Sequence, residues 1–169
     1  MCAMIKHRMK IAVAADHAGF PLKQRVIEEV RKLGHEPSDL GTDSTDPVDY
    51  PDYARAVAEA VRAGRADRAV LVCGSGAGAC VAANKFRGIR AATCHDTFSA
   101  HQGVEDDGMN VMCLGARVVG PELAAELVRS YLNAKFSNLD RHRRRVDKIE
   151  QFEVEFGSEP PTAATQTLR

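Results

Sequence analysis

A short apolar segment that ends in a glycine-rich turn limits the folds open to this chain of 169 residues. The segment Ala69-Val70-Leu71-Val72 has the continuous apolar character of a strand buried on both faces. It leads directly into Cys73-Gly74-Ser75-Gly76-Ala77-Gly78, and the helix-forming run 79–85 follows. A strand, a tight turn and a helix in this order predict a βα unit. Its backbone N–H groups and helix N-terminus favour an anion at the turn.

Three interpretations of this turn are open from the residues alone. Cys73 is a buried core thiol, or a catalytic cysteine facing an oxyanion-stabilising loop, or part of a dinucleotide-binding fingerprint. The fingerprint spacing is met by Gly74-x-Gly76-x-x-Ala79, with Asp96 about twenty residues on where a ribose-binding acid belongs. The position of the turn argues against the dinucleotide-binding interpretation, because that fingerprint normally lies in the first βα turn and a βα unit precedes it here.

Strand-like and helix-like segments alternate along the chain. The expected strands are 10–15, 37–40, 68–73, 89–93 and 110–114, and the expected helices are 22–33, 51–63, 79–85, 96–105, 121–133 and 141–156. The alternation predicts an α/β fold, a single Rossmann-like three-layer domain with a parallel sheet of about five strands flanked by helices. The domain is expected to span 9–156, and residues 157–169 are expected to form a disordered tail.

Composition excludes several classes of protein. The 23 basic and 23 acidic side chains cancel, so no global charge favours nucleic acid or a membrane surface. Neither a membrane-spanning run nor the apolar core of a secretory signal is present, which predicts a cytoplasmic protein. Five cysteines form no CxxC pair, and six histidines show no metal-type spacing. We therefore expect a reducing compartment and neither metal nor other cofactor.

Polar residues follow three of the expected strands. Asp16-His17-Ala18-Gly19 follows the first, Cys73 and Ser75 end the third, and Cys94-His95-Asp96 ends the fourth. Since the carboxyl ends of parallel strands meet at one edge of a sheet, these groups are expected to converge on a site. For Asp96 the alternative is a helix N-cap. A histidine at position 17 has no apolar face to join and can donate to a phosphate.

A basic run, Arg141-His142-Arg143-Arg144-Arg145, opens the last expected helix. Such a run is often only a solvated face. Arg141 and Arg145 are four residues apart, however, and therefore share one helical face, where two guanidinium groups can hold one phosphate.

The chain resembles ribose-5-phosphate isomerase B and its sugar-phosphate isomerase relatives over roughly residues 9–150. The motifs that carry the resemblance are Asp16-His17-Ala18-Gly19, Asp49-Tyr50-Pro51, Cys73-Gly74-Ser75-Gly76, Ala82-Ala83-Asn84-Lys85, Gly88-Ile89-Arg90-Ala91, Leu114-Gly115-Ala116-Arg117-Val118 and Arg141-His142. The resemblance implies a Rossmann-like subunit and a homodimer with sites at the subunit interface. It also implies interconversion of an aldose phosphate with its ketose phosphate without metal or nucleotide.

The resemblance further implies roles for individual residues. Cys73 would carry a proton from C2 to C1 of the sugar through a cis-enediolate, and Ser75 would hydrogen-bond the substrate. Some members use a glutamate of the glycine loop as the base, but this chain has Ala79 there. The implied substrate-binding residues are Asp16, His17, Tyr50, Gly74, Gly76, Gly78, Asp107, Arg117, Arg141 and Arg145. Of these, His17 and the three arginines would hold the phosphate, some of them from the partner subunit.

At one position the chain departs from the family pattern. Ribose-acting members carry a ring-opening histidine where this chain has Asp106, and many have asparagine where it has Asp107. Asp106 as a general base and His101 one helical turn away are the two candidates for ring opening. Ribose 5-phosphate is the expected substrate, and a tetrose 4-phosphate, allose 6-phosphate or galactose 6-phosphate are the alternatives. A non-enzymatic nucleotide- or phosphosugar-binding module is the alternative function.

Overall fold

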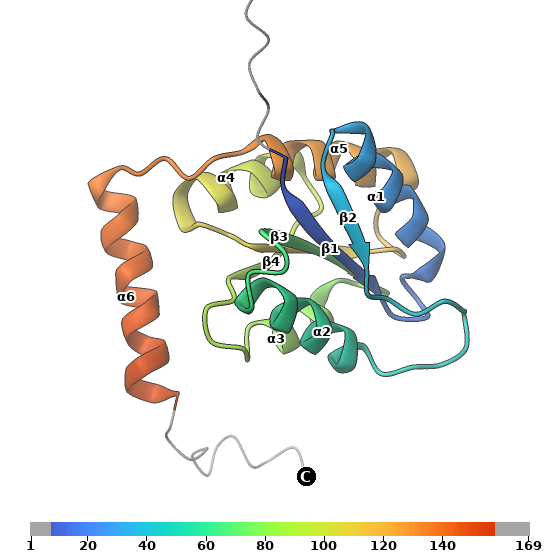
Figure 1. Ribbon diagram of the computed structural model, residues 1–169, viewed down its shortest axis with the longest axis horizontal. Coiled ribbons are helices and arrows are strands. Elements are labelled where there is room, and N and C mark those ends of the chain that lie inside the picture. The colour runs from blue at the N-terminus through green and yellow to red at the C-terminus, as the bar shows by residue number, and fades with distance from the viewer. Residues whose placement is uncertain (1–7, 158–169) are drawn as a thin grey trace, which may run out of the picture.

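A five-stranded parallel sheet forms the middle layer of the computed structural model, which describes residues 8–157 (Figure 1). The strands are β1 (Lys10–Ala15), β2 (Glu36–Asp39), β3 (Arg68–Cys73), β4 (Ala91–Thr93) and β5 (Val111–Gly115), in the spatial order β2-β1-β3-β5-β4. The apolar strands β1, β3 and β5 are central because helices cover both of their faces. The polar strand β2 lies at an edge, where its side chains reach solvent.

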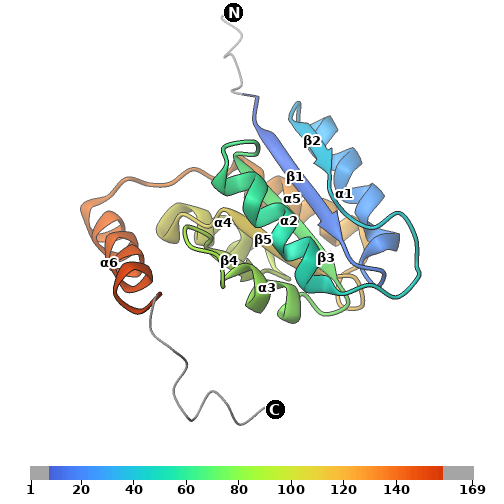
Figure 2. The ribbon, with the colours of Figure 1, turned by 60° about the horizontal axis from the view of Figure 1, so that its bottom comes forward.

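Helices form the two outer layers. One face of the sheet packs against α1 (Phe20–Lys32), α4 (Thr97–Asp107) and α5 (Pro121–Asn133), and the other packs against α2 (Tyr50–Arg62) and α3 (Ala77–Ala83) (Figure 2). A proline in the first turn of α1, α2 and α5 presets the backbone where each helix begins. The last helix, α6 (Asp140–Phe156), stands apart from the layers and contacts α4 (Figure 1).

The predicted fold class is confirmed, and β1, β3 and α5 have the predicted bounds. Two predicted segments were wrong in extent because of Asn84. Its side-chain amide bonds both the N–H and the C=O of Ala91, each at 2.8 Å, and this contact joins the end of α3 to the start of β4. The helix therefore ends at Ala83, and β4 begins at Ala91 rather than at Ile89. Apart from Gly157, the expected tail 157–169 lies outside the described residues.

The turn between β1 and α1 crosses the end of β3 at van der Waals distance. A Cβ atom at Gly19 would lie 2.2 Å from the carbonyl oxygen of Val72, the residue before Cys73. The same turn is held by Asp16, whose carboxylate accepts the N–H of Gly19 at 2.8 Å. The absence of a side chain at Gly19 therefore sets how closely the first and third strand ends approach each other.

We expect Gly19→Ala to lower the free energy of unfolding by about 2 kcal/mol or more, because a backbone carbonyl must move to admit the methyl group. Gly120→Ala is the matched control, since nothing lies within 4 Å of a Cβ at Gly120. Urea unfolding followed by circular dichroism measures both variants. Equal stability of the two variants would contradict this explanation.

Candidate active site

A pocket of about 320 Å³ opens at the carboxyl edge of the sheet, where the turns after β1 and β3 meet the turn after β5. Eight residues singled out from the sequence line it: Asp16, His17, Tyr50, Cys73, Gly74, Ser75, Gly78 and Arg117. Ala18 and Val118 complete the lining, and no chemical signal in the sequence marked them as site residues. The predicted convergence of the first and third strand ends is thus observed.

Cys73 ends β3 and is 95% buried, with 5% of its surface exposed. The backbone N–H of Gly76 donates to its Sγ at 3.1 Å. Gly76 reaches this position with φ of 83°, a left-handed backbone conformation that favours glycine. Gly76 thus acts through the thiol instead of lining the pocket.

His17 is oriented by the loop before α2. The N–H of Val48 donates to Nδ1 of His17 at 3.1 Å. The carbonyl oxygen of Val48 also lies 3.2 Å from Nδ1, so the backbone of Val48 can bond this nitrogen in either tautomer. The ring thus lines the pocket in an orientation that Val48 fixes.

Arg117 brings a positive charge to the glycine turn. Its backbone N–H donates to the C=O of Gly74 at 3.0 Å, and the N–H of Ala116 donates to the C=O of Cys73 at 2.8 Å. Its guanidinium lies over Gly74, 3.5 Å from where a Cβ would be. On the other side of the turn, the Tyr50 ring lies 2.9 Å from the Cβ position of Gly78. A larger residue at Gly78 would displace this ring.

The fourth strand end does not join the pocket, contrary to the expected convergence of three strand ends. Strand β5 lies between β3 and β4 and separates them. Asp96 caps α4 by accepting the N–H of Ser99 at 2.7 Å, and this backbone hydrogen bond lowers the pKa of Asp96. His95 accepts the N–H of Gly115 at 3.1 Å through Nε2 and so supports the turn that carries Arg117. Cys94 packs in the core on the α1, α4 and α5 face.

The remaining predicted residues lie at the opposite edge of the sheet. Helix α4 leaves the carboxyl end of β4 and ends at Asp107, just before the amino end of β5. Asp106 and Asp107 are therefore remote from Cys73 of the same chain. Arg141 and Arg145, both exposed, begin α6 beside the end of α4. Within one chain, the predicted site residues therefore form two separate groups.

A hydrogen-bonded network occupies the second group. His142 is 3% exposed, and its Nδ1 lies 3.3 Å from Oδ1 of Asp106 and 2.7 Å from Oγ of Ser137. Nε of Arg141 donates to Nε2 of His142 at 3.0 Å, so the neutral ring carries its hydrogen on Nδ1. Gln102 donates to the other oxygen of Asp106 at 2.8 Å. His142 was not among the predicted site residues, although it stands within the basic run noted in the sequence.

The other candidate for ring opening is also engaged. Nε2 of His101 lies 2.8 Å from a carboxylate oxygen of Glu105, one turn further along α4. Both side chains are largely exposed. His101 and Asp106 are not partners of each other, because Asp106 pairs with Gln102 and His142 instead.

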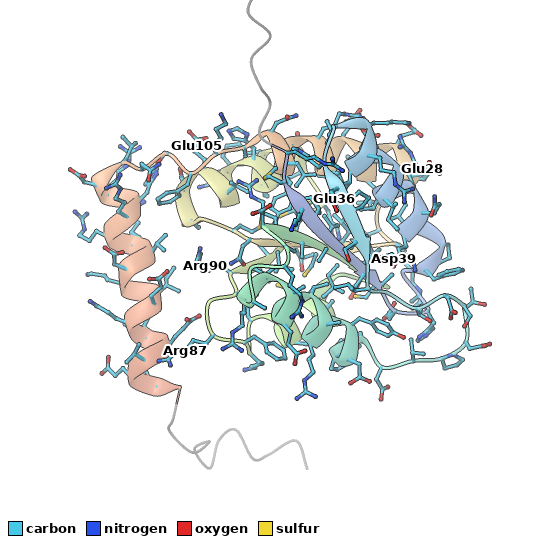
Figure 3. The ribbon with its side chains drawn as sticks, viewed as in Figure 1. Glu28, Glu36, Asp39, Arg87, Arg90 and Glu105 are labelled. Atoms are coloured by element: carbon cyan, nitrogen blue, oxygen red, sulfur yellow. The ribbon has the colours of Figure 1, made fainter. Side chains whose placement is uncertain are left out.

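A groove of about 1100 Å³ separates α6 from the body of the protein. Apolar side chains line both walls, including Ile149, Phe152 and Phe156 of α6 and Met109 opposite. Polar contacts span the groove: Arg90 pairs with Glu150 at 3.4 Å, Arg87 donates to the C=O of Glu153 at 3.4 Å, and the Glu153 carboxylate accepts the N–H of Gly88 at 2.8 Å. Figure 3 shows Arg87 and Arg90 in the gap between α6 and the body.

Two features are absent from residues 8–157. No helix there has the length and apolar character to cross a membrane. Nor does that part of the chain contain a group of three or more His, Cys, Asp or Glu side chains able to hold a metal ion.

Comparisons with known proteins agree with this architecture. Residues 11–149 match the family described as Ribose/Galactose Isomerase. Ribose-5-phosphate isomerase B of Escherichia coli is 43% identical over 144 residues, which cover 85% of this chain and 96% of the relative. D-erythrulose-4-phosphate isomerase of Pectobacterium atrosepticum is 40% identical over 147 residues, 86% of this chain and 95% of the relative.

Solved structures give the same result. The chain superposes on ribose-5-phosphate isomerase B of Clostridium thermocellum with a TM-score of 0.85 and 42% identity, covering 88% of this chain and 99% of that one. The Mycoplasma genitalium enzyme, solved with bound ribulose 5-phosphate, gives a TM-score of 0.81 and 36% identity, with 86% and 97% covered. The sheet order, the cysteine pocket and these matches together show that the chain belongs to the ribose-5-phosphate isomerase B family of aldose–ketose isomerases.

Proposed function

We propose that this protein interconverts ribose 5-phosphate and ribulose 5-phosphate, with Cys73 as the group that moves the proton. The observation that carries the proposal is the Cys73 thiol in a pocket that also contains His17 and Arg117, two donors suited to a phosphate. Support also comes from relatives of this chain that are named for ribose 5-phosphate and from the neighbouring structure with bound ribulose 5-phosphate.

The proposed reaction follows from these positions. The Cys73 thiolate takes the proton from C2, and the C2–H electron pair forms the C1–C2 double bond of a cis-enediolate as negative charge moves to the carbonyl oxygen at C1. Backbone N–H groups of the turn that includes Gly74 and Gly78 stabilise that charge, and Ser75 holds the substrate hydroxyls. The thiol then returns the proton to C1, the proton of the C2 hydroxyl passes to the negatively charged oxygen on C1, and the C2=O double bond of the ketose forms. Cys73 thus acts as base and acid in turn.

We also infer that a second copy of the chain completes each site. Arg141, Arg145 and Asp107 lie at the sheet edge opposite Cys73, so one chain cannot place both groups on one small sugar phosphate. A second copy that presents its α4–α6 junction to the pocket would supply them. Its surface would also cover apolar side chains that α6 leaves exposed, among them Phe152 at 56% and Phe156 at 52% exposure.

A tetrose 4-phosphate is the second candidate substrate, and the network around Asp106 favours it. Gln102 and His142 already bind both oxygens of Asp106, and Glu105 binds His101, so both candidates for ring opening have partners. A tetrose esterified at O4 has no hydroxyl with which to close a furanose ring, and it therefore needs no ring opening. Relatives named D-erythrulose-4-phosphate isomerase, 40% and 39% identical to this chain, support this candidate.

A substrate panel tests these proposals. We expect ketose formation from ribose 5-phosphate without added metal or nucleotide, when the purified protein is assayed beside erythrose 4-phosphate, allose 6-phosphate and galactose 6-phosphate. If only the tetrose or a hexose is turned over, that sugar phosphate and not ribose 5-phosphate is the substrate. If none of the four sugars is turned over, but calorimetry shows binding of NAD or of a sugar phosphate, the result would instead support a non-enzymatic binding module.

The variant Asp106→His is assayed on the same panel of sugars. If Asp106 limits ring opening, the variant gains turnover on ribose 5-phosphate relative to erythrose 4-phosphate, and Asp106→Asn does not.

A cytoplasmic location belongs to the same proposal, supported by the free thiols Cys73, Cys80, Cys94 and Cys113.

A further inference from the structure

Helix α6 has one buried side chain, and that side chain is polar. Among the residues of α6, all of which the structure describes, only His142 is buried, with 3% of its surface exposed. The neighbouring Arg141 is exposed, and so is Phe152 further along the helix. The proposed reaction uses Arg141 for the phosphate and leaves His142 without a role. Since burying an imidazole is costly unless its nitrogens are hydrogen-bonded, the partners of His142 indicate what it does.

Both nitrogens of His142 have partners, and these partners favour one tautomer of the ring. Nε of Arg141 donates to Nε2 at 3.0 Å, so Nε2 supplies the lone pair. Nδ1 lies 2.7 Å from Oγ of Ser137 and 3.3 Å from a carboxylate oxygen of Asp106. An ionised carboxylate only accepts hydrogen bonds, so Asp106 favours the tautomer with its hydrogen on Nδ1. Arg141 and Asp106 thus select the same neutral ring from its two sides.

The partners on the Nδ1 side are themselves held in place. Asp106 belongs to α4, and the backbone N–H of Ser137 donates to the C=O of Glu105 in the same helix at 3.0 Å. Oγ of Ser137 also accepts the N–H of Leu139, just before α6, at 3.3 Å. His142 is therefore supported by the end of α4 and by the segment that leads into its own helix. From this support, its Nε2 reaches the side chain of Arg141.

We propose that His142 is a positioning residue for Arg141: it holds Nε of the guanidinium and leaves the edge formed by Nη1 and Nη2 to the sugar phosphate. A guanidinium that is ordered before binding loses less conformational entropy when the phosphate arrives. The neutral imidazole also leaves the charge of Arg141 intact, whereas a carboxylate bound directly to Arg141 would compete with the phosphate. This proposal rests on the proposed function, which assigns the phosphate to Arg141.

Two amide side chains at position 142 test the proposal in the full-length protein. The oxygen of a glutamine reaches the position of Nε2 and can accept from Arg141, whereas an asparagine replaces only the contacts of Nδ1. In His142→Asn we expect the Kd for ribose 5-phosphate, measured by calorimetry, to rise by about fivefold, because Arg141 must then be ordered on binding. In His142→Gln the Kd should stay within about twofold of the original. In both variants kcat should change less than the Kd, because the phosphate is not the reacting group.

A double-mutant cycle separates positioning from a merely structural role. In the Arg141→Ala background, His142→Asn should not raise the Kd further, because the residue through which His142 acts is absent. Arg143→Ala is the matched control for the loss of charge. It removes an exposed arginine of the same basic run, whose side chain donates to Asn138 at 3.3 Å, and should keep the original Kd. Thermal unfolding followed by circular dichroism shows whether each variant is folded.

The outcomes separate the positioning role from the proposed isomerase. Equal Kd values in His142→Asn and His142→Gln would overturn the positioning role and leave the isomerase proposal intact. A further rise of the Kd when His142→Asn is added to Arg141→Ala would do the same, because His142 would then act independently of Arg141. The expected pattern of Kd values in a protein that turns over no sugar phosphate would uphold the positioning role and refute the isomerase.

Discussion

Cys73→Ala should lower kcat for ribose 5-phosphate by about a thousandfold, within the range expected for loss of a general acid–base group. The Kd for the substrate should stay within about threefold of the original, because the proposed mechanism assigns the phosphate to His17 and the arginines and the missing thiol acts chiefly in the transition state. Direct assay of ketose formation measures the first quantity, and isothermal titration calorimetry measures the second.

Two variants make this result specific to Cys73. Cys94→Ala removes a buried thiol from the opposite face of the sheet and should keep turnover close to that of the original protein. Cys73→Ser keeps a side chain of similar size with a far weaker acid, and we expect it to be nearly as inactive as the alanine variant. Near-normal turnover in Cys73→Ala would refute the proposed proton carrier.

Mixing two inactive variants should restore activity if sites are shared between copies. Cys73→Ala damages the pocket group, and Arg141→Ala damages the group at the α4–α6 junction. In a mixed dimer one site receives both defects, and the other site receives neither. Random exchange of subunits makes about half of the dimers mixed, and each mixed dimer has one intact site and one defective site. We therefore expect about a quarter of the original activity.

A second pair of variants serves as the control for this experiment. His17 and Cys73 line the same pocket of one chain, so mixing Cys73→Ala with His17→Ala leaves every site defective and should restore nothing. Native mass spectrometry confirms that mixed dimers form in both experiments. Mixed dimers that remain inactive in the Arg141 experiment, or a chain that stays monomeric at micromolar concentration, would refute the shared site.

Local features of the sequence were enough to predict the pocket around Cys73. The apolar run that ends at Cys73, the glycines that follow it, and the Asp16-His17 pair after the first strand each act within a few residues of the chain. Parallel strands then bring their carboxyl ends together, so the pocket follows from the βα alternation itself. The bounds of β1, β3 and α5 were predictable for the same reason.

The relations between distant segments could not be predicted in this way. Hydrophobic periodicity does not specify strand order, and the insertion of β5 between β3 and β4 removes His95 and Asp96 from the pocket. The contact between Asp106 and His142 joins residues on two helices whose packing only the folded chain defines.

The α/β class, the cysteine turn and the family of this protein could therefore be predicted, because they depend on short-range patterns and on motifs in order. The position of Arg141, Arg145, Asp106 and Asp107 at the sheet edge opposite Cys73 depends instead on how the chain folds. The physical reason is that α4 must run the full depth of the sheet to connect the carboxyl end of β4 with the amino end of β5.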